Sequence, residues 1–418
     1  MLLNKSRAYE VMDRHGLDGL VAKENINIYY LTDYWESMTD GGWPFLDYAV
    51  LPRREDAPAA LVLPTIKLDR LSELPTWVPN IIAFSDYSGR EPVASQVIDP
   101  ATKEPPAAPW SGWLVRPGAD LTKTEQAWLD RATSHAGRLA PTPAWGLRRA
   151  LVDAGLEAAT IGTDDPRVLY WMRDMGCPDL TVVDATNIFR EIRMVKSPDE
   201  VTLMRRAATI NEAACRAAAA AIHDGAEWPE IEIVFHTELS RLGGRNGHIV
   251  GNLGGFRHGA IRRGVPMFVD AIGEYQHYFG DFGRSVVLGE PDDELVRRSK
   301  AMQAGWDAAC EILRAGVKRS TVIARTIEVV QKAGLPEFFY VSPHSIGLEH
   351  TDSPLPYGPD IHGKQSDYTF EENMTINIDL PFTEWGWGSM HLEDTLLVTS
   401  DGFEPLTSME NDLVVVPA

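Results

Sequence analysis

Two segments in the second half of the chain each have the pattern of a strand, a turn and a second strand, with an acidic residue on both strands. Asp270 and Asp281 are eleven residues apart, so folding the chain about residues 275–276 sets them opposite each other. Asp379 and Glu393 are symmetric about a glycine between two tryptophans, which allows the same cross-strand pairing. The sequence therefore predicts two antiparallel hairpins, each with a facing pair of carboxylates.

Carboxylates held this close in a partly apolar sheet repel each other unless protons or cations lie between them. A bound metal explains such pairs economically, and His344, with a glycine three residues later, is a further candidate ligand. An oxygen-rich site with one imidazole suits manganese and, with less selectivity, iron, cobalt or zinc. Two bridged ions would hold a hydroxide of lowered pKa and polarise a carbonyl, which is hydrolytic chemistry. Spacing alone leaves an alternative interpretation, in which the acidic residues face solvent and the histidine is structural.

Around the hairpins the sequence shows a coarse repeat, two helices followed by a hairpin, which occurs twice and is typical of an α+β domain. Helices are expected at residues 198–222, 229–241, 291–314 and 320–333, and strands at 265–272, 278–288, 375–380 and 390–398. The first helix has a clear start signal, because Ser197 can cap it, Pro198 suits its first position and Glu200 can reach back to the cap. We therefore place a domain boundary near residue 190, which gives domains 1–190 and 191–418.

The first domain alternates helix and strand patterns in a way that builds α/β layers. The pattern predicts a helix at residues 6–15, a short buried strand at 19–22 and another strand at 27–31. Thr122 and Glu125 form a capping box ahead of a later helix.

Composition excludes several classes of function. Acidic side chains number 60 against 39 basic ones, a formal net charge of −21, so nucleic acid and membrane surfaces are poor partners. The three cysteines form no CxxC motif, which argues against a disulfide framework and a thiolate zinc site. The N-terminus carries charges where a signal peptide needs an apolar core, and no apolar run approaches the ~18 residues of a membrane span. We expect a soluble protein of the reducing cytoplasm.

The order of the acidic residues and the histidine resembles that of the pita-bread superfamily, which includes prolidase, Xaa-Pro aminopeptidase, methionine aminopeptidase and creatinase. Its metallopeptidase ligands run as an aspartate, a second aspartate eleven residues on, a histidine in an HxxG motif, and two glutamates. In this chain the corresponding places hold Asp270, Asp281, His344, Asp379 and Glu393. Segments 17–32, 192–200 and 393–406 also resemble the family, so the resemblance covers nearly the whole chain. It implies an α+β fold, with a C-terminal pita-bread (creatinase/aminopeptidase) catalytic domain preceded by an α/β creatinase-type N-terminal domain.

The resemblance also implies a cofactor and a reaction. The ligands would hold two divalent ions, manganese first and cobalt, zinc or iron as alternatives. Asp270 would chelate one ion, Asp281 and Glu393 would bridge, and His344 with Asp379 would complete the other. The implied enzyme is a metal-dependent hydrolase of the Xaa-Pro dipeptidase or aminopeptidase type, which uses a metal-bridging hydroxide to cleave the amide bond before proline in short peptides.

Further histidines complete the implied site. His350 matches the histidine that contacts the substrate carbonyl or the tetrahedral intermediate, and Asp379 takes the place of the general acid and base. A third histidine usually precedes the first aspartate on a loop, and His258 or His248 could fill that place. We favour His258 as a catalytic residue because its loop follows a Gly-Gly turn. His350, His391 and His248 are the residues expected to bind substrate.

Two departures from the family pattern bear on the substrate. Asp379 stands where the peptidases carry glutamate, and His391 stands where an arginine often precedes the last glutamate. These departures motivate an alternative, a related member that acts on a non-peptide amide or a small zwitterion as a creatinase-like hydrolase or lyase. A second alternative is a non-catalytic binding protein on this fold. Because the family is commonly dimeric, a homodimer is expected.

Overall fold

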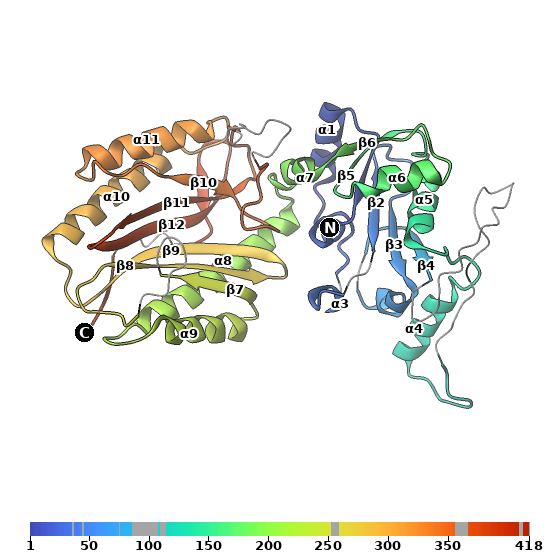
Figure 1. Ribbon diagram of the computed structural model, residues 1–418, viewed down its shortest axis with the longest axis horizontal. Coiled ribbons are helices and arrows are strands. Elements are labelled where there is room, and N and C mark those ends of the chain that lie inside the picture. The colour runs from blue at the N-terminus through green and yellow to red at the C-terminus, as the bar shows by residue number, and fades with distance from the viewer. Residues whose placement is uncertain are drawn as a thin grey trace. The chain divides into compact units, whose positions relative to one another are not determined.

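The computed structural model describes residues 1–35, 37–43, 46–74, 76–85, 108, 114–251, 259–355, 367–408 and 413–417. These residues divide into two compact units, Met1–Ile192 and Arg193–Ala418 (Figure 1). Among the described helices, none combines the length and the apolar composition that crossing a bilayer requires. His258 lies outside the described residues, so its expected place in the site stays a prediction.

The first unit is built on a six-stranded mixed sheet with the strand order β4-β3-β2-β1-β5-β6. Its strands are β1 Gly19–Ala22, β2 Tyr48–Pro52, β3 Ala60–Pro64, β4 Asn80–Phe84, β5 Thr160–Thr163 and β6 Thr181–Asp184. Its helices are α1 Lys5–His15, α2 Asn25–Thr32, α3 Ser37–Asp40, α4 Lys123–Thr133, α5 Pro143–Asp153, α6 Arg167–Asp174 and α7 Thr186–Arg193, with short 3-10 turns at Thr65–Lys67 and Asp69–Ser72. Apolar residues of β1 to β3 pack on α5 to form the core. The predicted α/β character and the capping box at Thr122 are confirmed.

The strand predicted at residues 27–31 is wrong, because this segment forms helix α2. Two backbone N–H groups just before the helix and the Asn27 side chain donate hydrogen bonds of 2.7, 3.1 and 2.8 Å to the Asp164 carboxylate. Asp33 ends the helix in the left-handed conformation, with φ of 59°. A carboxylate remote in sequence thus anchors the start of a short buried helix, and this tertiary contact outweighs the strand preference of its isoleucine and tyrosine residues.

The second unit is built on an eight-stranded sheet with the order β10-β11-β12-β9-β8-β7, to which β13 adds beside β12 and β14 beside β9. The strands are β7 Arg245–Val250, β8 Met267–Tyr275, β9 Tyr278–Leu288, β10 Ser342–Ser345, β11 Thr375–Glu384, β12 Gly388–Val398, β13 Phe403–Pro405 and β14 Val414–Val416. The helices are α8 Pro198–Ala220, α9 Trp228–Arg241, α10 Asp293–Ile312 and α11 Arg319–Lys332. The predicted repeat of two helices and a hairpin is confirmed, and so is the capping box that starts α8. Strands β7, β10, β13 and β14 were not predicted.

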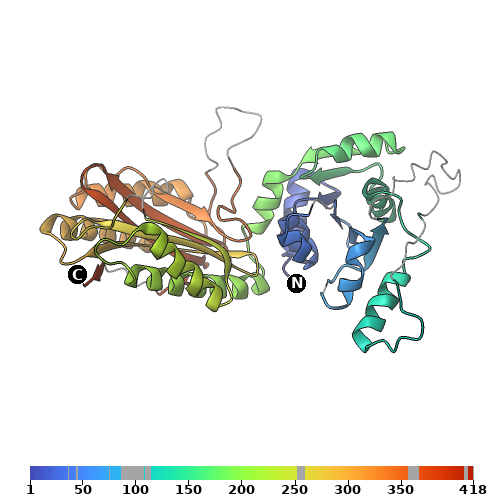
Figure 2. The same cartoon turned by 60° about the horizontal axis from the view of Figure 1, so that its bottom comes forward.

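Helix α8 lies along β8 and β9 and α9 lies beside β7, while α10 lies beside β12 and α11 beside β10 (Figures 1 and 2). Phe282 of β9 is buried in the core formed with α8 and α9, and Ile378 of β11 in the core formed with α10 and α11. Because successive side chains of a strand point to opposite faces, the neighbours Asp281 and Asp379 point away from these helices. We call the face that carries Asp281 and Asp379 the ligand face.

The two hairpins differ in register. In the second, Asp379 pairs directly with Glu393, which confirms the predicted cross-strand pair. In the first, the turn lies at residues 276–277, both with positive φ, so Asp270 pairs with Gly283. The prediction that Asp270 faces Asp281 directly is therefore wrong. A shift of two residues keeps both side chains on the ligand face as diagonal neighbours, because side-chain direction repeats every two residues.

Candidate metal centre

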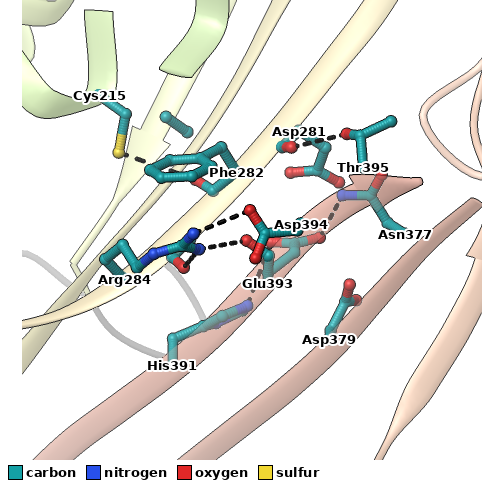
Figure 3. Close-up of polar contacts among 12 residues, drawn as sticks. Cys215, Asp281, Phe282, Arg284, Asn377, Asp379, His391, Glu393, Asp394 and Thr395 are labelled. Atoms are coloured by element: carbon teal, nitrogen blue, oxygen red, sulfur yellow. Dashed lines mark hydrogen bonds and ion pairs between the residues drawn. The ribbon is translucent and has the colours of Figure 1, made fainter. Parts of the chain in front are cut away.

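Residues that are paired between neighbouring strands form two adjacent rows across the ligand face. In one row, Gly283 of β9 lies between Asp270 of β8 and Glu393 of β12, and Glu393 lies opposite Asp379 of β11. The next row holds Asp281, Thr395, Asn377 and His344. Figure 3 shows the carboxylates of Asp281, Asp379 and Glu393 approaching one another from these strands. The five predicted ligands therefore come from five adjacent strands to one patch of the sheet.

On the side of the second hairpin, two imidazoles approach the carboxylates. His344 Nε2 lies 3.4 Å from Asp379 Oδ2 and 3.8 Å from Asp281 Oδ2. The Nδ1 atom of His344 lies 3.2 Å from the Ser345 carbonyl oxygen, a contact that can fix the tautomer whose Nε2 lone pair faces the carboxylates. His350 Nε2 lies 2.9 Å from Asp281 Oδ2. His350 therefore reaches the same cluster, as predicted for a residue of the site.

On the side of the first hairpin, Asp270, His391 and Glu393 each offer a ligand atom, and these atoms lie within 4.8 Å of one another. His391 Nε2 is 3.1 Å from Glu393 Oε2. The other oxygen, Glu393 Oε1, accepts a hydrogen bond of 2.8 Å from the Asn377 amide. Sequence reasoning missed Asn377, although its place between two buried isoleucines of a predicted strand would have assigned it to the ligand face.

The residues present fit a metal. Asp281 and Glu393 are each only 1% exposed, and one carboxylate oxygen on each of Asp270, Asp281 and Asp379 is buried without a hydrogen-bond partner among the described residues. Buried oxygens of this kind are costly unless a proton or a cation satisfies them. Four carboxylates with an imidazole form a donor set of hard oxygens and one nitrogen, which binds divalent manganese, iron, cobalt or zinc.

The electrostatics support the same conclusion. Burial and the neighbouring Glu393 carboxylate raise the pKa of Asp270 to about 7, and they raise the pKa of Asp281 well above its usual value. Burial opposes the charged forms of His344 and Asp379, but their mutual attraction outweighs it, raising the pKa of His344 to about 9 and lowering that of Asp379. The cluster therefore requires positive charge at neutral pH, from protons or from metal ions.

The buried arginine of β9, Arg284, does not supply this charge. Arg284 points to the helix-covered face, where it donates a 2.8 Å hydrogen bond to Asp394 and stacks 4.0 Å from the centre of the Phe282 ring (Figure 3). It also donates to the backbone carbonyl of Glu393, at 2.5 Å. Arg284 thus neutralises Asp394 and orients the strand, while the carboxylates on the ligand face keep their own charge.

A buried ion-pair network holds the loop that carries His350. Arg193, only 1% exposed, donates hydrogen bonds of 2.9 and 2.7 Å to Asp352, and Lys196 Nζ lies 3.7 Å from the same carboxylate. A Cβ atom at Gly347 would lie 2.5 Å from Asp352 Oδ2 and 2.7 Å from Lys196 Nζ, so the glycine of the HxxG motif leaves room for this network. Sequence reasoning had used segment 192–200 as a boundary signal and as part of the family resemblance, and it missed this function.

His248 lies on β7 opposite Ile272, next along the row that contains Asp281, and it is exposed. It is thus placed on the ligand face at the edge of the site, consistent with its predicted substrate contact. The choice between His248 and His258 stays open, because His258 is outside the described residues.

Comparison with known proteins identifies the second unit. Residues 202–400 match the model of metallopeptidase family M24. The resemblance to the pita-bread metallopeptidases is confirmed, and this match together with the dipeptidase relatives supports a metal-dependent hydrolase.

Curated relatives extend the similarity along the chain. The probable dipeptidase PepE of Mycobacterium tuberculosis is 29% identical over 296 residues, which cover 65% of this chain and 74% of that protein. The Xaa-Pro dipeptidase of Pyrococcus horikoshii is 26% identical over 242 residues, which cover 54% of this chain and 66% of that protein.

Solved structures share the fold over the whole chain. An Xaa-Pro dipeptidase from Bacillus anthracis superposes with a TM-score of 0.71 at 16% identity, covering 99% of both chains. Dipeptidase PepE from Mycobacterium ulcerans gives a TM-score of 0.69 at 20% identity, covering 99% of this chain and 97% of that one. The predicted fold class is confirmed.

Proposed function

We propose that this M24 hydrolase is a dinuclear enzyme of the Xaa-Pro dipeptidase or aminopeptidase type, which cleaves the amide bond before proline in short peptides. The observation that carries the proposal is the convergence of four carboxylates and His344 on one sheet face, with buried oxygens that have no hydrogen-bond partner among the described residues. The names of the mycobacterial and Pyrococcus relatives support dipeptide substrates.

The register suggests how the ligands divide. Asp270 would hold one ion, His344 and Asp379 the other, and Asp281 and Glu393 would bridge, because these two lie between the outer groups. Two divalent ions bound there lower the pKa of a water molecule and polarise the scissile carbonyl. The predominance of carboxylate oxygens favours manganese as the metal.

The chain's own residues would orient the peptide and move the proton. Burial and the neighbouring His344 lower the pKa of His350 to about 4, so its imidazole is neutral at neutral pH. A neutral His350 can donate one hydrogen bond to the carbonyl oxygen as negative charge develops there. Asp379 would hold the proton at its carboxylate and pass it to the leaving nitrogen, the role of general acid and base.

A second candidate keeps the metal site but changes the substrate. The Asp379 side chain is one methylene shorter than the glutamate of the family pattern, and His391 is buried where that pattern has arginine. Both changes lie next to the cluster, so they favour a non-peptide amide or a small zwitterion as the alternative substrate.

The test begins with elemental analysis of protein reconstituted with manganese, followed by hydrolysis of a panel of Xaa-Pro dipeptides with matched Xaa-Ala dipeptides as controls. We expect two ions per chain and turnover restricted to the proline series. Two bound ions without turnover of any dipeptide would remove the peptidase proposal and favour the second candidate. Less than one ion per chain, with no activity, would remove both.

We also propose that the protein is a cytoplasmic homodimer. The support is the resemblance to a commonly dimeric family and the absence of any CxxC motif in the sequence. Light scattering coupled to size exclusion measures the oligomeric state, and a monomeric mass at micromolar concentration would contradict the homodimer.

A further inference from the structure

The backbone and ring of His391 are fixed beside the carboxylate cluster. His391 is 4% exposed and lies on β12 next to Ser285 of β9, whose hydroxyl donates to its carbonyl oxygen and accepts from its N–H group, both at 3.0 Å. Its ring lies 5.1 Å from the ring of Phe268. These contacts hold the imidazole in one place, two residues along β12 from Glu393.

Gly283 makes room for this ring. A Cβ atom at Gly283 would lie 2.6 Å from Cδ2 and 2.9 Å from Nε2 of His391, and 3.1 Å from Glu393 Oε2. Gly283 is also the residue that separates Asp270 from Glu393 in the central row. The absence of a side chain in mid-strand therefore opens a space into which an imidazole and two carboxylates converge.

The distances between these side chains match those between two ligands of a single metal ion. Two donors about 2.1 Å from a metal and at right angles lie about 3 Å apart. His391 Nε2 is 3.1 Å from Glu393 Oε2, which compares with 3.4 Å between His344 Nε2 and Asp379 Oδ2 on the other side. Both ring nitrogens of His391 and Asp270 Oδ1 are buried without a hydrogen-bond partner among the described residues. The two sides thus present the same combination of imidazole and carboxylate.

We infer that His391 is a metal ligand that completes the coordination of the ion held by Asp270. Each half of the centre then contains one imidazole. The inference rests on the dinuclear centre of the proposed function and adds a sixth ligand to it. It also replaces the substrate-binding role that the sequence suggested for His391.

A second imidazole changes the preferred metal. Imidazole nitrogen suits zinc, cobalt and iron, whereas sites built from carboxylates alone suit manganese and magnesium. We therefore expect the site beside Asp270 to bind cobalt and zinc more tightly, relative to manganese, than it does after His391 is replaced.

Metal affinity and ligand counting test the inference. His391→Gln keeps a polar side chain of similar length and removes the imidazole. Chelator competition with cobalt should show one of the two ions weakened by more than about 100-fold, which is the upper range for loss of a group that only supports a ligand. His344→Gln is the matched variant for the other half and should weaken one ion similarly. His350→Gln, which removes a third histidine of the site, should leave both ions bound.

X-ray absorption of the zinc-loaded wild type counts imidazoles directly and needs no variant to fold. We expect one imidazole for each ion, and one for every two ions in H391Q. One imidazole for every two ions in the wild type, or unchanged affinities in H391Q, would overturn the inference while the dinuclear centre stands. A wild type that binds no metal would overturn the proposed function as well.

Discussion

The two hairpins of the second unit contribute to the centre in different ways. In β11–β12, Asp379 lies directly opposite Glu393, and its imidazole partner His344 comes from the edge strand β10. In β8–β9, Asp270 lies opposite a glycine, and the imidazole beside it is His391 from the neighbouring hairpin. The same arrangement of two helices and a hairpin thus gives two half-sites with different surroundings.

One segment at the start of the unit anchors both halves. Arg193 binds Asp352 in the loop that carries His350, which belongs to the half around β11. One turn into α8, Glu200 accepts a 3.1 Å hydrogen bond from the hydroxyl of Tyr278, at the turn of the β8–β9 hairpin. The halves therefore differ in the strands that supply the carboxylate and the imidazole, while their support is shared.

Replacing the residue between the halves should have the largest effect. Glu393→Gln keeps the size of the side chain and an acceptor for Asn377, but it removes the charge shared by both half-sites. We expect less than one bound ion per chain and a loss of kcat/KM of at least about 10³-fold, measured by elemental analysis and kinetics. Glu404→Gln, at an exposed glutamate, is the matched control. Two tightly bound ions in E393Q would contradict the bridging role.

Breaking the anchor of the β11 half should separate positioning from metal binding. Arg193→Gln removes the guanidinium that pairs with the buried Asp352, so we expect the free energy of unfolding to fall by about 3–5 kcal/mol in denaturant titrations. Metal content should remain at two ions per chain while kcat falls, because the loop that carries His350 is no longer fixed. The control Arg205→Gln breaks an exposed pair and should cost about 0–1 kcal/mol. Equal stability of R193Q and R205Q would disprove the anchoring role.

The anchor of the β8–β9 half predicts a pH dependence. Burial raises the pKa of Glu200 to about 7, against a smaller opposing effect of Lys196, so the folded state binds a proton that the unfolded state releases near pH 4.5. The contribution of this proton to the free energy of unfolding is fully present below pH 4.5. It is lost as the pH rises through 7, by up to about 3 kcal/mol. Glu200→Gln keeps the cap on Ser197 and removes this titration. The difference between the unfolding free energies at pH 5 and pH 8 should therefore be smaller in E200Q than in the wild type, and an unchanged pH slope would contradict the prediction.

The smallest effect is expected from lengthening one ligand. Asp379→Glu restores the family's usual residue, and the carboxylate it keeps should retain both ions. Because the longer side chain brings the proton nearer to the leaving nitrogen, kcat on Xaa-Pro dipeptides should rise by up to about tenfold. A fall in kcat with full metal content would show instead that the site is adapted to the shorter aspartate, as the second candidate substrate requires.

The sequence was sufficient where the signal was local. Alternation in β11 places Asp379 on one face and Ile378 on the other, and the glycine at residue 386 fixes the centre of that hairpin, so the Asp379–Glu393 pair was predictable. The Ser197–Glu200 capping box was equally visible, because it depends on residues only three apart.

Long-range contacts explain what the sequence did not show. The first hairpin turns at Gln276 and His277, which adopt positive φ without the glycine or asparagine that usually marks such a turn, so its register was predicted two residues out. The role of Arg193 depends on a partner 159 residues away. The ligand spacing at His391 depends on Gly283, a residue with no polar group to attract notice.

The most direct test of two unlike half-sites is a crystal structure of the zinc-loaded protein with anomalous diffraction data at the zinc edge. We predict two peaks per chain, one within ligand distance of Asp270 and His391 and the other within ligand distance of His344 and Asp379, with Glu393 contacting both. A single peak, or two peaks with His391 beyond ligand distance of either, would contradict this account.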